Sequence, residues 1–214
     1  MKLHPIACAA LVAALTAALL PVSAARADVL VDNLLQPPRD TSVIESALWA
    51  AQSFVTAGQA VNLQSIELWL GQRLGDPLIT AELRADSAGG VGGPAAALAT
   101  FSLPALSMGA TQIELLPVVP QLELAAATTY WIVLGVPDVG SFGWTYGEGN
   151  NQTGPGSLGN FNYSTDAGLS WVNFGADNPY LVRVNVTAVP EPASAATLLA
   201  GIALLVALRR RPRS

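Results

Sequence analysis

Short apolar runs, separated by Gly, Pro, Asn and Asp, dominate residues 28–188 of this 214-residue chain. In 79–84, apolar and polar positions alternate with a period of two, which is typical of a strand with one buried face. The same alternation in 181–186 places three valines on one face. The continuous apolar run 130–134 suits a strand that is buried on both faces.

The other strand candidates have the same short length and the same turn signals at their ends. They are 29–34, 50–55, 65–70, 96–103, 112–116, 142–146, 160–164 and 170–174. No long stretch shows the 3.6-residue period of a helix, and a helical turn is expected within 41–51 alone. Many short strands joined by turns predict an all-β fold, a single antiparallel β-sandwich that is jelly-roll-like.

The N-terminal segment 1–27 has the three parts of a secretory signal peptide. Lys2 supplies a positive charge, 6–20 is apolar apart from Thr16, and small residues precede the expected cleavage after Ala27. The segment therefore predicts export and processing by signal peptidase. An uncleaved N-terminal anchor is the alternative.

The C-terminal segment 189–214 begins with Val-Pro-Glu-Pro and continues as the apolar run 193–208. As a helix this run would span roughly 24 Å, which is short of the roughly 30 Å hydrocarbon core of a bilayer. The arginines that follow it are expected to stay on the cytoplasmic side of the membrane. They are Arg209, Arg210 and Arg211. The prolines prevent a helix from running back into the body.

Pro190, Glu191 and Pro192, followed by the apolar run and the arginines, resemble a PEP-CTERM sorting signal. The resemblance implies that the three residues are recognised by an exosortase and that the arginines act as a retention charge. It further implies a Gram-negative bacterium that makes exopolysaccharide and biofilm matrix. The protein would be anchored transiently in the inner membrane, cleaved near Glu191 and delivered to the cell surface or extracellular matrix. A permanent tail anchor is the alternative.

The body 28–188, between the signal peptide and the sorting signal, resembles a choice-of-anchor domain. The residues that carry this resemblance are Gln52-Ser53-Phe54, 65–70, Leu83-Arg84-Ala85-Asp86, 128–134 and 179–184. Choice-of-anchor domains are bacterial surface modules without a defined activity. The resemblance therefore implies a β-sandwich surface module and supplies no catalytic residue.

The composition of 28–188 excludes several kinds of chemistry. This segment has no Cys, His or Lys, and its 14 acidic residues against four arginines give a formal charge of −10. It therefore has no imidazole base, thiol nucleophile, Schiff-base lysine, His/Cys zinc site or disulfide. An acidic body is also a poor partner for nucleic acid. Glycoside hydrolysis by two carboxylates is the enzymatic chemistry left, and no pair stands out. We therefore expect that this protein is not an enzyme.

Residues Ser164–Trp171 fit the Asp-box pattern S-x-D-x-G-x-[ST]-W, which in sialidases is structural. Asp166 is expected to accept hydrogen bonds from turn amides, Gly168 to adopt a positive φ, and Trp171 to pack beneath the turn. A ligand role is the alternative. Calcium is conceivable near Asp166 or Asp177, but the D-x-[DN]-x-[DN]-G spacing is absent, so no metal or other cofactor is expected.

Ten of the 14 aromatic residues lie between Tyr130 and Tyr180. Trp144 and Tyr146 share a strand face with Phe142 by alternation. Two interpretations are open: a sugar-stacking surface, with Trp144 and Tyr146 as ligand contacts, or ordinary sandwich core. The functional hypotheses are a structural matrix component associated with exopolysaccharide, a carbohydrate-binding module, and a calcium-dependent adhesin.

Overall fold

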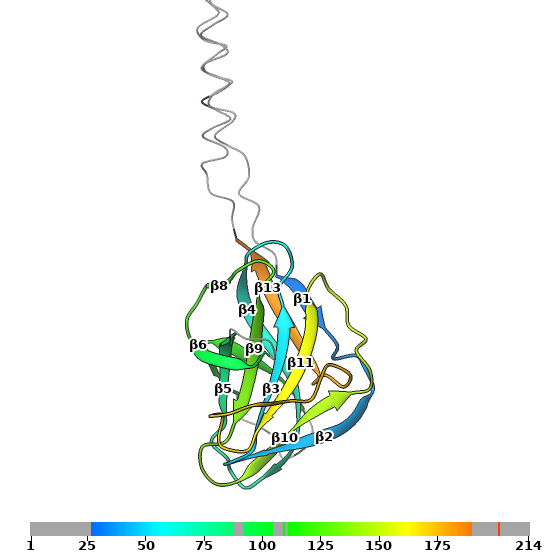
Figure 1. Cartoon of the computed structure of the whole chain (residues 1–214), viewed down its shortest axis with the longest axis vertical. Helices are drawn as coiled ribbons and strands as arrows, with labels where there is room; N and C mark the ends of the chain where they lie inside the picture. The colour runs from blue at the N-terminus through cyan, green and yellow to red at the C-terminus, as the bar shows by residue number, and fades with distance from the viewer. Residues whose placement is uncertain (1–26, 88–91, 105–108, 110, 190–200, 202–214) are drawn as a thin grey trace, which may run out of the picture. The chain divides into compact units, whose positions relative to one another are not determined.

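Antiparallel strands make up the body in a computed structural model, which describes residues 27–87, 92–104, 109, 111–189 and 201 (Figure 1). The strands are β1 (Asp28–Asp32), β2 (Pro38–Glu45), β3 (Trp49–Val55), β4 (Val61–Leu74), β5 (Thr80–Asp86), β6 (Pro94–Ser102), β7 (Thr111–Pro117), β8 (Leu122–Leu124), β9 (Thr129–Gly135), β10 (Ser141–Gly147), β11 (Ser157–Ser164), β12 (Val172–Asn173) and β13 (Val182–Ala188). The predicted all-β, antiparallel fold is confirmed. Within the described ranges, no helix combines the length and apolarity needed to cross a bilayer.

The strands form one curled sheet with two halves that face each other. The first half contains β1, β13, β4, β10 and β2, and β4 also pairs with β7 and β8. The second half runs β12-β11-β3-β9-β5-β6. A short pairing between β6 and β7 joins the two halves. Curling of this kind leaves an interior layer for the apolar side chains.

The core follows the alternation in the sequence. On β13 the three valines at 182, 184 and 186 are buried, and Arg183 and Asn185 between them are partly exposed. On β9 six consecutive residues, from Tyr130 to Gly135, are buried, as expected for a strand covered on both faces. Complete burial of one side chain of Val, Leu, Ile or Phe size contributes about 1.5–3 kcal/mol. The body therefore has an extensive apolar core without disulfides.

The expected helical turn within 41–51 is wrong. Residues Pro38–Glu45 form β2, and a tight turn, closed by the Glu45 amide donating to the Leu48 carbonyl at 3.0 Å, leads into β3. β2 pairs with β10 over most of its length. This tertiary pairing, together with β-branched residues such as Thr41 and Val43, outweighs the weak local helical signal.

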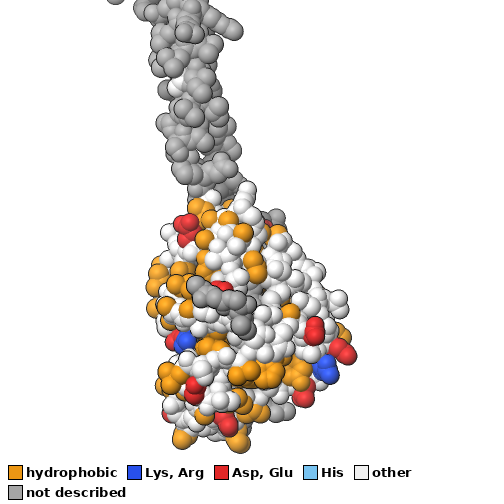
Figure 2. Space-filling view, in the orientation of Figure 1, with side chains coloured by type: hydrophobic (Ala, Val, Ile, Leu, Met, Phe, Trp, Pro, Cys, Tyr) orange, Lys and Arg blue, Asp and Glu red, His pale blue; other side chains and the backbone are white. Residues whose placement is uncertain are grey.

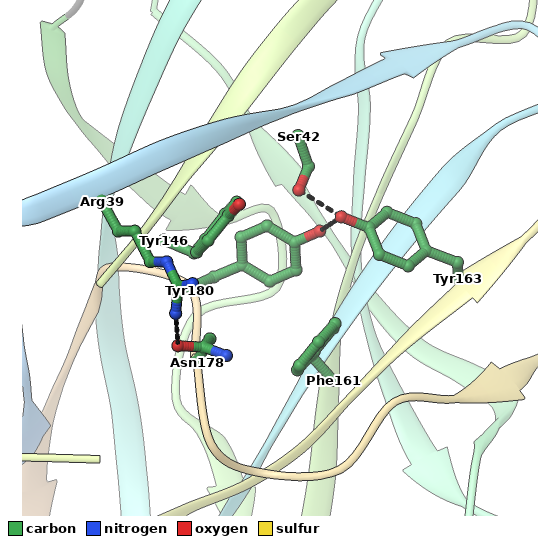
Figure 3. A pocket seen from close by; sticks show the side chains of 7 residues that line it. All are labelled: Arg39, Ser42, Tyr146, Phe161, Tyr163, Asn178 and Tyr180. Carbon is green, nitrogen blue, oxygen red and sulfur yellow. Dashed lines mark hydrogen bonds between the residues drawn. The ribbon is translucent and has the colours of Figure 1, made fainter. Parts of the chain in front are cut away.

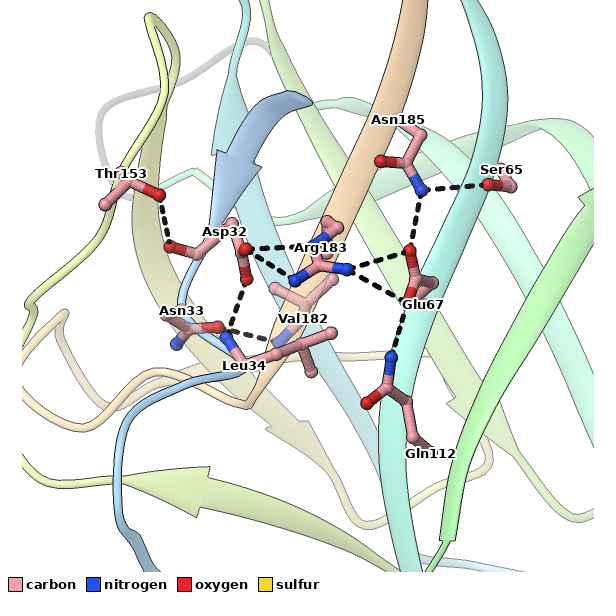
Figure 4. Close-up of polar contacts among 10 residues, drawn as sticks. All are labelled: Asp32, Asn33, Leu34, Ser65, Glu67, Gln112, Thr153, Val182, Arg183 and Asn185. Carbon is pink, nitrogen blue, oxygen red and sulfur yellow. Dashed lines mark hydrogen bonds and ion pairs between the residues drawn. The ribbon is translucent and has the colours of Figure 1, made fainter. Parts of the chain in front are cut away.

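Arg183 ties three strands of the first half together (Figure 4). Its guanidinium donates to Asp32 Oδ2 at 2.9 Å and to Glu67 at 3.3 Å, and Glu67 also accepts from Asn185 at 2.9 Å and from Gln112. Burial alone would lower the pKa of Arg183, but the hydrogen bonds and charges of Asp32 and Glu67 outweigh it and raise that pKa. The network holds β1, β13 and β4 in register.

The first and last strands of the body lie side by side. Asp28 at the start of β1 pairs with Val186 near the end of β13, and Ala188 pairs with Val61 at the start of β4 (Figure 1). The expected cleavage residue Ala27 is exposed next to this position. The polypeptide therefore enters and leaves the body at the same end.

Candidate functional site

A pocket of about 230 Å³ lies where β2, β10 and β11 meet the segment before β13 (Figure 3). It is lined by Arg39, Ser42, Tyr146, Phe161, Tyr163, Asn178 and Tyr180. Four of these side chains are aromatic, and the others carry hydrogen-bonding groups. In Figure 3, Arg39 and Asn178 lie on the left of the pocket, Ser42 lies at its top and Tyr163 lies on its right.

Tyr180 forms the inner wall of this pocket, because it lines the pocket although it is only 1% exposed. The rings of Tyr146, Phe161 and Tyr163 stand nearly perpendicular to it, at 85°, 80° and 76°, with centroids 6.0–6.3 Å away. Edge-to-face pairs of this kind are favourable and fix the orientation of each ring. The pocket walls are therefore preorganised.

A chain of hydroxyl groups crosses the pocket. Tyr180 donates to the Tyr163 hydroxyl, which donates to Ser42 Oγ. Burial raises the pKa of Tyr180 well above 10, so this phenol remains a protonated donor at all ordinary pH values. Ser42 accepts the last hydrogen bond of this series of hydroxyl groups and keeps its own hydrogen as a donor. The three hydroxyl groups thus provide neutral polar groups along the pocket wall.

Arg39 gives the pocket a positive charge. Its Nη1 donates to Asn178 Oδ1 at 2.8 Å. Arg84 and Arg183 form ion pairs with carboxylates, whereas Arg39 forms none among the described residues. Acidic side chains are spread over the face in Figure 2 and basic ones are few, in line with the formal charge of 28–188. Within the part of the chain that the structure describes, Arg39 is therefore a cation without an ion-pair partner on an acidic body.

The two residues proposed as sugar contacts have different positions. Tyr146 lines the pocket. Trp144 is 0% exposed and stacks on the far side of the pocket wall against Tyr180, so it offers no face to a ligand; for this residue the core interpretation holds. Phe142, on the same strand face, is buried as well. The strand face thus runs from the core at Phe142 to the pocket at Tyr146.

The sequence did not point to six of the seven lining residues. Phe161, Tyr163 and Tyr180 belong to the aromatic-rich part of the chain, which is the signal that could have found them. Arg39 and Ser42 carried no such signal, because they reach the pocket through the pairing of β2 with β10.

The Asp-box segment forms a turn centred on Asp166. Its Oδ1 accepts from Ser164 Oγ at 2.7 Å and from the Ser170 amide at 2.8 Å, and its Oδ2 accepts from Ser170 Oγ at 2.6 Å. The hydroxyls of Ser170 and Ser164 and the Ser170 amide lower the pKa of Asp166 to about 2. Gly168 has a φ of +84°, which favours glycine. Both carboxylate oxygens are thus bonded within the turn.

Trp171, at the end of this turn, packs on the outer face of the second half of the sheet. It contacts a small apolar cluster that contains Trp49, Trp131 and Val133. The Ala167 amide also donates to the Ala47 carbonyl at 3.1 Å, which joins the turn to the β2–β3 connection. Among the described residues, no group of three or more Asp, Glu, His or Cys side chains is placed to hold a metal ion.

The proposed sorting residues begin directly after the body. Pro190, Glu191 and Pro192 lie outside the described residues, as do the three arginines at 209–211. A family model described as the PEP-CTERM protein-sorting motif matches residues 188–211. The chain carries a PEP-CTERM sorting motif. The match begins at Ala188, the last residue of β13.

The PEP-CTERM motif marks this chain as an exported, exosortase-sorted protein with a membrane-anchored sorting signal. The exosortase is thereby its processing partner. The choice-of-anchor resemblance of the body is not confirmed by the comparisons. None of the curated proteins shows a significant match to the chain.

Proposed function

We propose that the body is a non-enzymatic extracellular module, which exosortase sorting delivers to the cell surface or matrix, where it associates with exopolysaccharide. The observation that carries this proposal is the PEP-CTERM motif at 188–211. β13 lies between β1 and β4 and ends at Ala188, so a cut near Glu191 removes no residue from the sheet. Processing would therefore release an intact body.

The positions of several carboxylates support a non-enzymatic role. Asp32 and Glu67 are paired with Arg183, Glu82 is paired with Arg84, and Asp166 is bonded within its turn. The pocket residues include no carboxylate, and glycoside hydrolysis in the ordinary mechanism needs two. Binding or structural support is therefore the better interpretation of this surface.

The experiment is performed in the producing bacterium, with the exosortase gene present or deleted and with Glu191→Ala. Loss of the enzyme or of Glu191 is expected to retain the uncut protein in the inner membrane. Glu148→Ala, which changes an exposed acidic residue of the body, is the matched control and is expected to be sorted normally. Equal export of all four samples would refute sorting by this route.

Association with exopolysaccharide has its own test. A strain that makes no exopolysaccharide is expected to release the processed protein into the medium, whereas the parent strain retains it in the matrix fraction. Equal retention by the two strains would contradict the association and leave sorting unaffected.

Saccharide binding is a second candidate, and the aromatic pocket specifically favours it. The C–H groups of a sugar ring are attracted to the negative face of an aromatic ring, and Tyr146 and Phe161 offer partly exposed rings here. Trp144 stacks behind Tyr180, so tryptophan fluorescence can report occupancy. A saturable change with the producer's own exopolysaccharide, reduced by Tyr146→Ala, is expected. No change at saturating polysaccharide would rule this candidate out.

A further inference from the structure

We propose that the pocket binds a carboxylated sugar residue, with Arg39 as the contact to its carboxylate. This inference rests on saccharide binding, the second candidate function, and adds the chemical class of the sugar. It follows from the charge, the size and the polar groups of the pocket.

The charge of Arg39 favours an anionic ligand. Arg39 lines the pocket and forms no ion pair among the described residues. Only Nη1 of the guanidinium donates to Asn178, and a guanidinium has five N–H donors, so the other N–H groups can form a bidentate pair with a carboxylate. Asn178 restrains the side chain without neutralising it. A positive charge in this position also disfavours a cationic ligand, which the aromatic walls alone would accept.

The size of the pocket favours a ligand of a single ring. The pocket of about 230 Å³ is smaller than the roughly 300–1,000 Å³ that is typical of sites for drug-sized ligands. It therefore suits one ring at a time, as when a single residue of a polysaccharide is inserted. The rings of Tyr146, Phe161 and Tyr163 are fixed by edge-to-face contacts with Tyr180, so little ordering cost is expected on binding.

The hydroxyl groups on the pocket wall favour a ligand that has hydroxyl groups of its own. Ser42 and Tyr163 present neutral hydroxyl groups across the pocket from Arg39 (Figure 3). Hydroxyls donate and accept, and this matches the hydroxyls of a sugar better than the surface of an apolar ligand. A carboxylated sugar matches all three features. Its carboxylate binds the guanidinium, its C–H face packs on the aromatic rings, and its hydroxyl groups form hydrogen bonds with the hydroxyl groups of the pocket.

The experiment measures binding of two probes to the exported protein purified from its producing cell. The probes are trigalacturonate and its fully methyl-esterified form, which keeps the ring and loses the charge. Titration calorimetry is expected to give trigalacturonate an affinity roughly tenfold higher than the ester, because a hydrogen bond to a charged group is worth more than a neutral one. Added salt is expected to reduce this preference.

Three variants separate the contributions. Arg39→Gln keeps an amide donor toward Asn178 and is expected to abolish the preference for trigalacturonate. Arg84→Gln removes the same formal charge from β5, away from the pocket residues, and is the matched control; the preference is expected to remain. Tyr146→Ala is expected to lower the affinity for both probes by a similar factor.

Each remaining outcome is decisive. Equal affinity for the two probes, or an unchanged preference in Arg39→Gln, overturns the assignment of Arg39 and leaves saccharide binding standing. A loss of preference in Arg84→Gln as large as in Arg39→Gln also overturns it, because the effect would then arise from net charge. Binding of neither probe at millimolar concentration overturns the inference, while a fluorescence response to native exopolysaccharide would still support the second candidate.

Discussion

The indole of Trp144 stacks on the phenol ring of Tyr180, with centroids 4.2 Å apart and planes inclined by 15°. The indole N–H donates to the Leu181 carbonyl at 3.4 Å, directly after Tyr180 in the chain. Tyr146, two residues after Trp144 on β10, also pairs with Tyr180 through an isolated β-bridge. β10 therefore positions the inner wall of the pocket from behind, through one buried side chain.

Trp144→Ala is expected to destabilise the body by about 3–5 kcal/mol, the usual cost of deleting a large buried aromatic side chain. Equilibrium unfolding in urea measures the loss. Trp69→Ala, at a half-buried position on β4, is the control and is expected to cost less. Equal losses in the two variants would show that the indole of Trp144 is not part of a tightly packed core.

Asp166 predicts a specific pH dependence of stability. Its pKa is lowered to about 2 in the folded protein from 3.8, so the carboxylate stabilises the fold above pH 4. This contribution is lost as the pH falls from about 4 through about 2, because the carboxylate is then protonated in both states. Asp166→Asn is expected to lower the Tm at pH 7.

The difference in Tm between wild type and Asp166→Asn is expected to shrink as the pH is lowered through this window. Melting curves at several pH values measure it, with Asp177→Asn as a control at an exposed carboxylate outside the turn. A difference that stays constant down to pH 2 would contradict the assigned hydrogen bonds. Lost saccharide binding with an unchanged Tm would instead give Asp166 a ligand role.

Arg183→Met is expected to destabilise the body by about 1–3 kcal/mol, because it leaves Asp32 and Glu67 without their shared donor. The carboxylates are only 11% and 17% exposed. In a double-mutant cycle with Asp32→Asn, the two changes are expected to be less than additive. Arg39→Gln, at an exposed position, is the control, with a change within about 0.5 kcal/mol. Full additivity in the cycle would mean that the ion pair contributes nothing.

Gly135→Ala is expected to destabilise the body by about 1–3 kcal/mol, as overpacking usually does. A Cβ at this position would clash with Cδ2 of Trp49, so the indole must move out of its cluster. Gly58→Ala is the matched control, because a Cβ there meets nothing within 4 Å. Thermal melting compares the two, and equal Tm values would show that the indole of Trp49 moves without cost.

Much of the fold could be predicted because its strongest signals are local. The valine alternation in β13 and the apolar run of β9 each correspond to a strand covered on one face or on both. β2 could not be predicted, because its apolar residues Val43 and Ile44 are adjacent and its partner β10 lies about 100 residues later. Strand pairing over such a distance is set by the whole fold and leaves no mark in the segment itself.

The candidate site was predictable only in part for the same reason. Tyr146 follows from aromatic density and from its place on β10. Alternation also puts Trp144 on that face, but burial changes along the strand, and only the residue near its end reaches the pocket. Arg39 joins the site through β2, so its relation to the aromatic residues is visible only in three dimensions.

The intact mass of the exported protein, isolated from the surface or medium of its native host, tests the central claim most directly. Sorting through the PEP-CTERM motif predicts a chain that begins at Asp28, ends near Glu191 and lacks residues 193–213. A mass that still includes this apolar segment and its arginines would contradict the account.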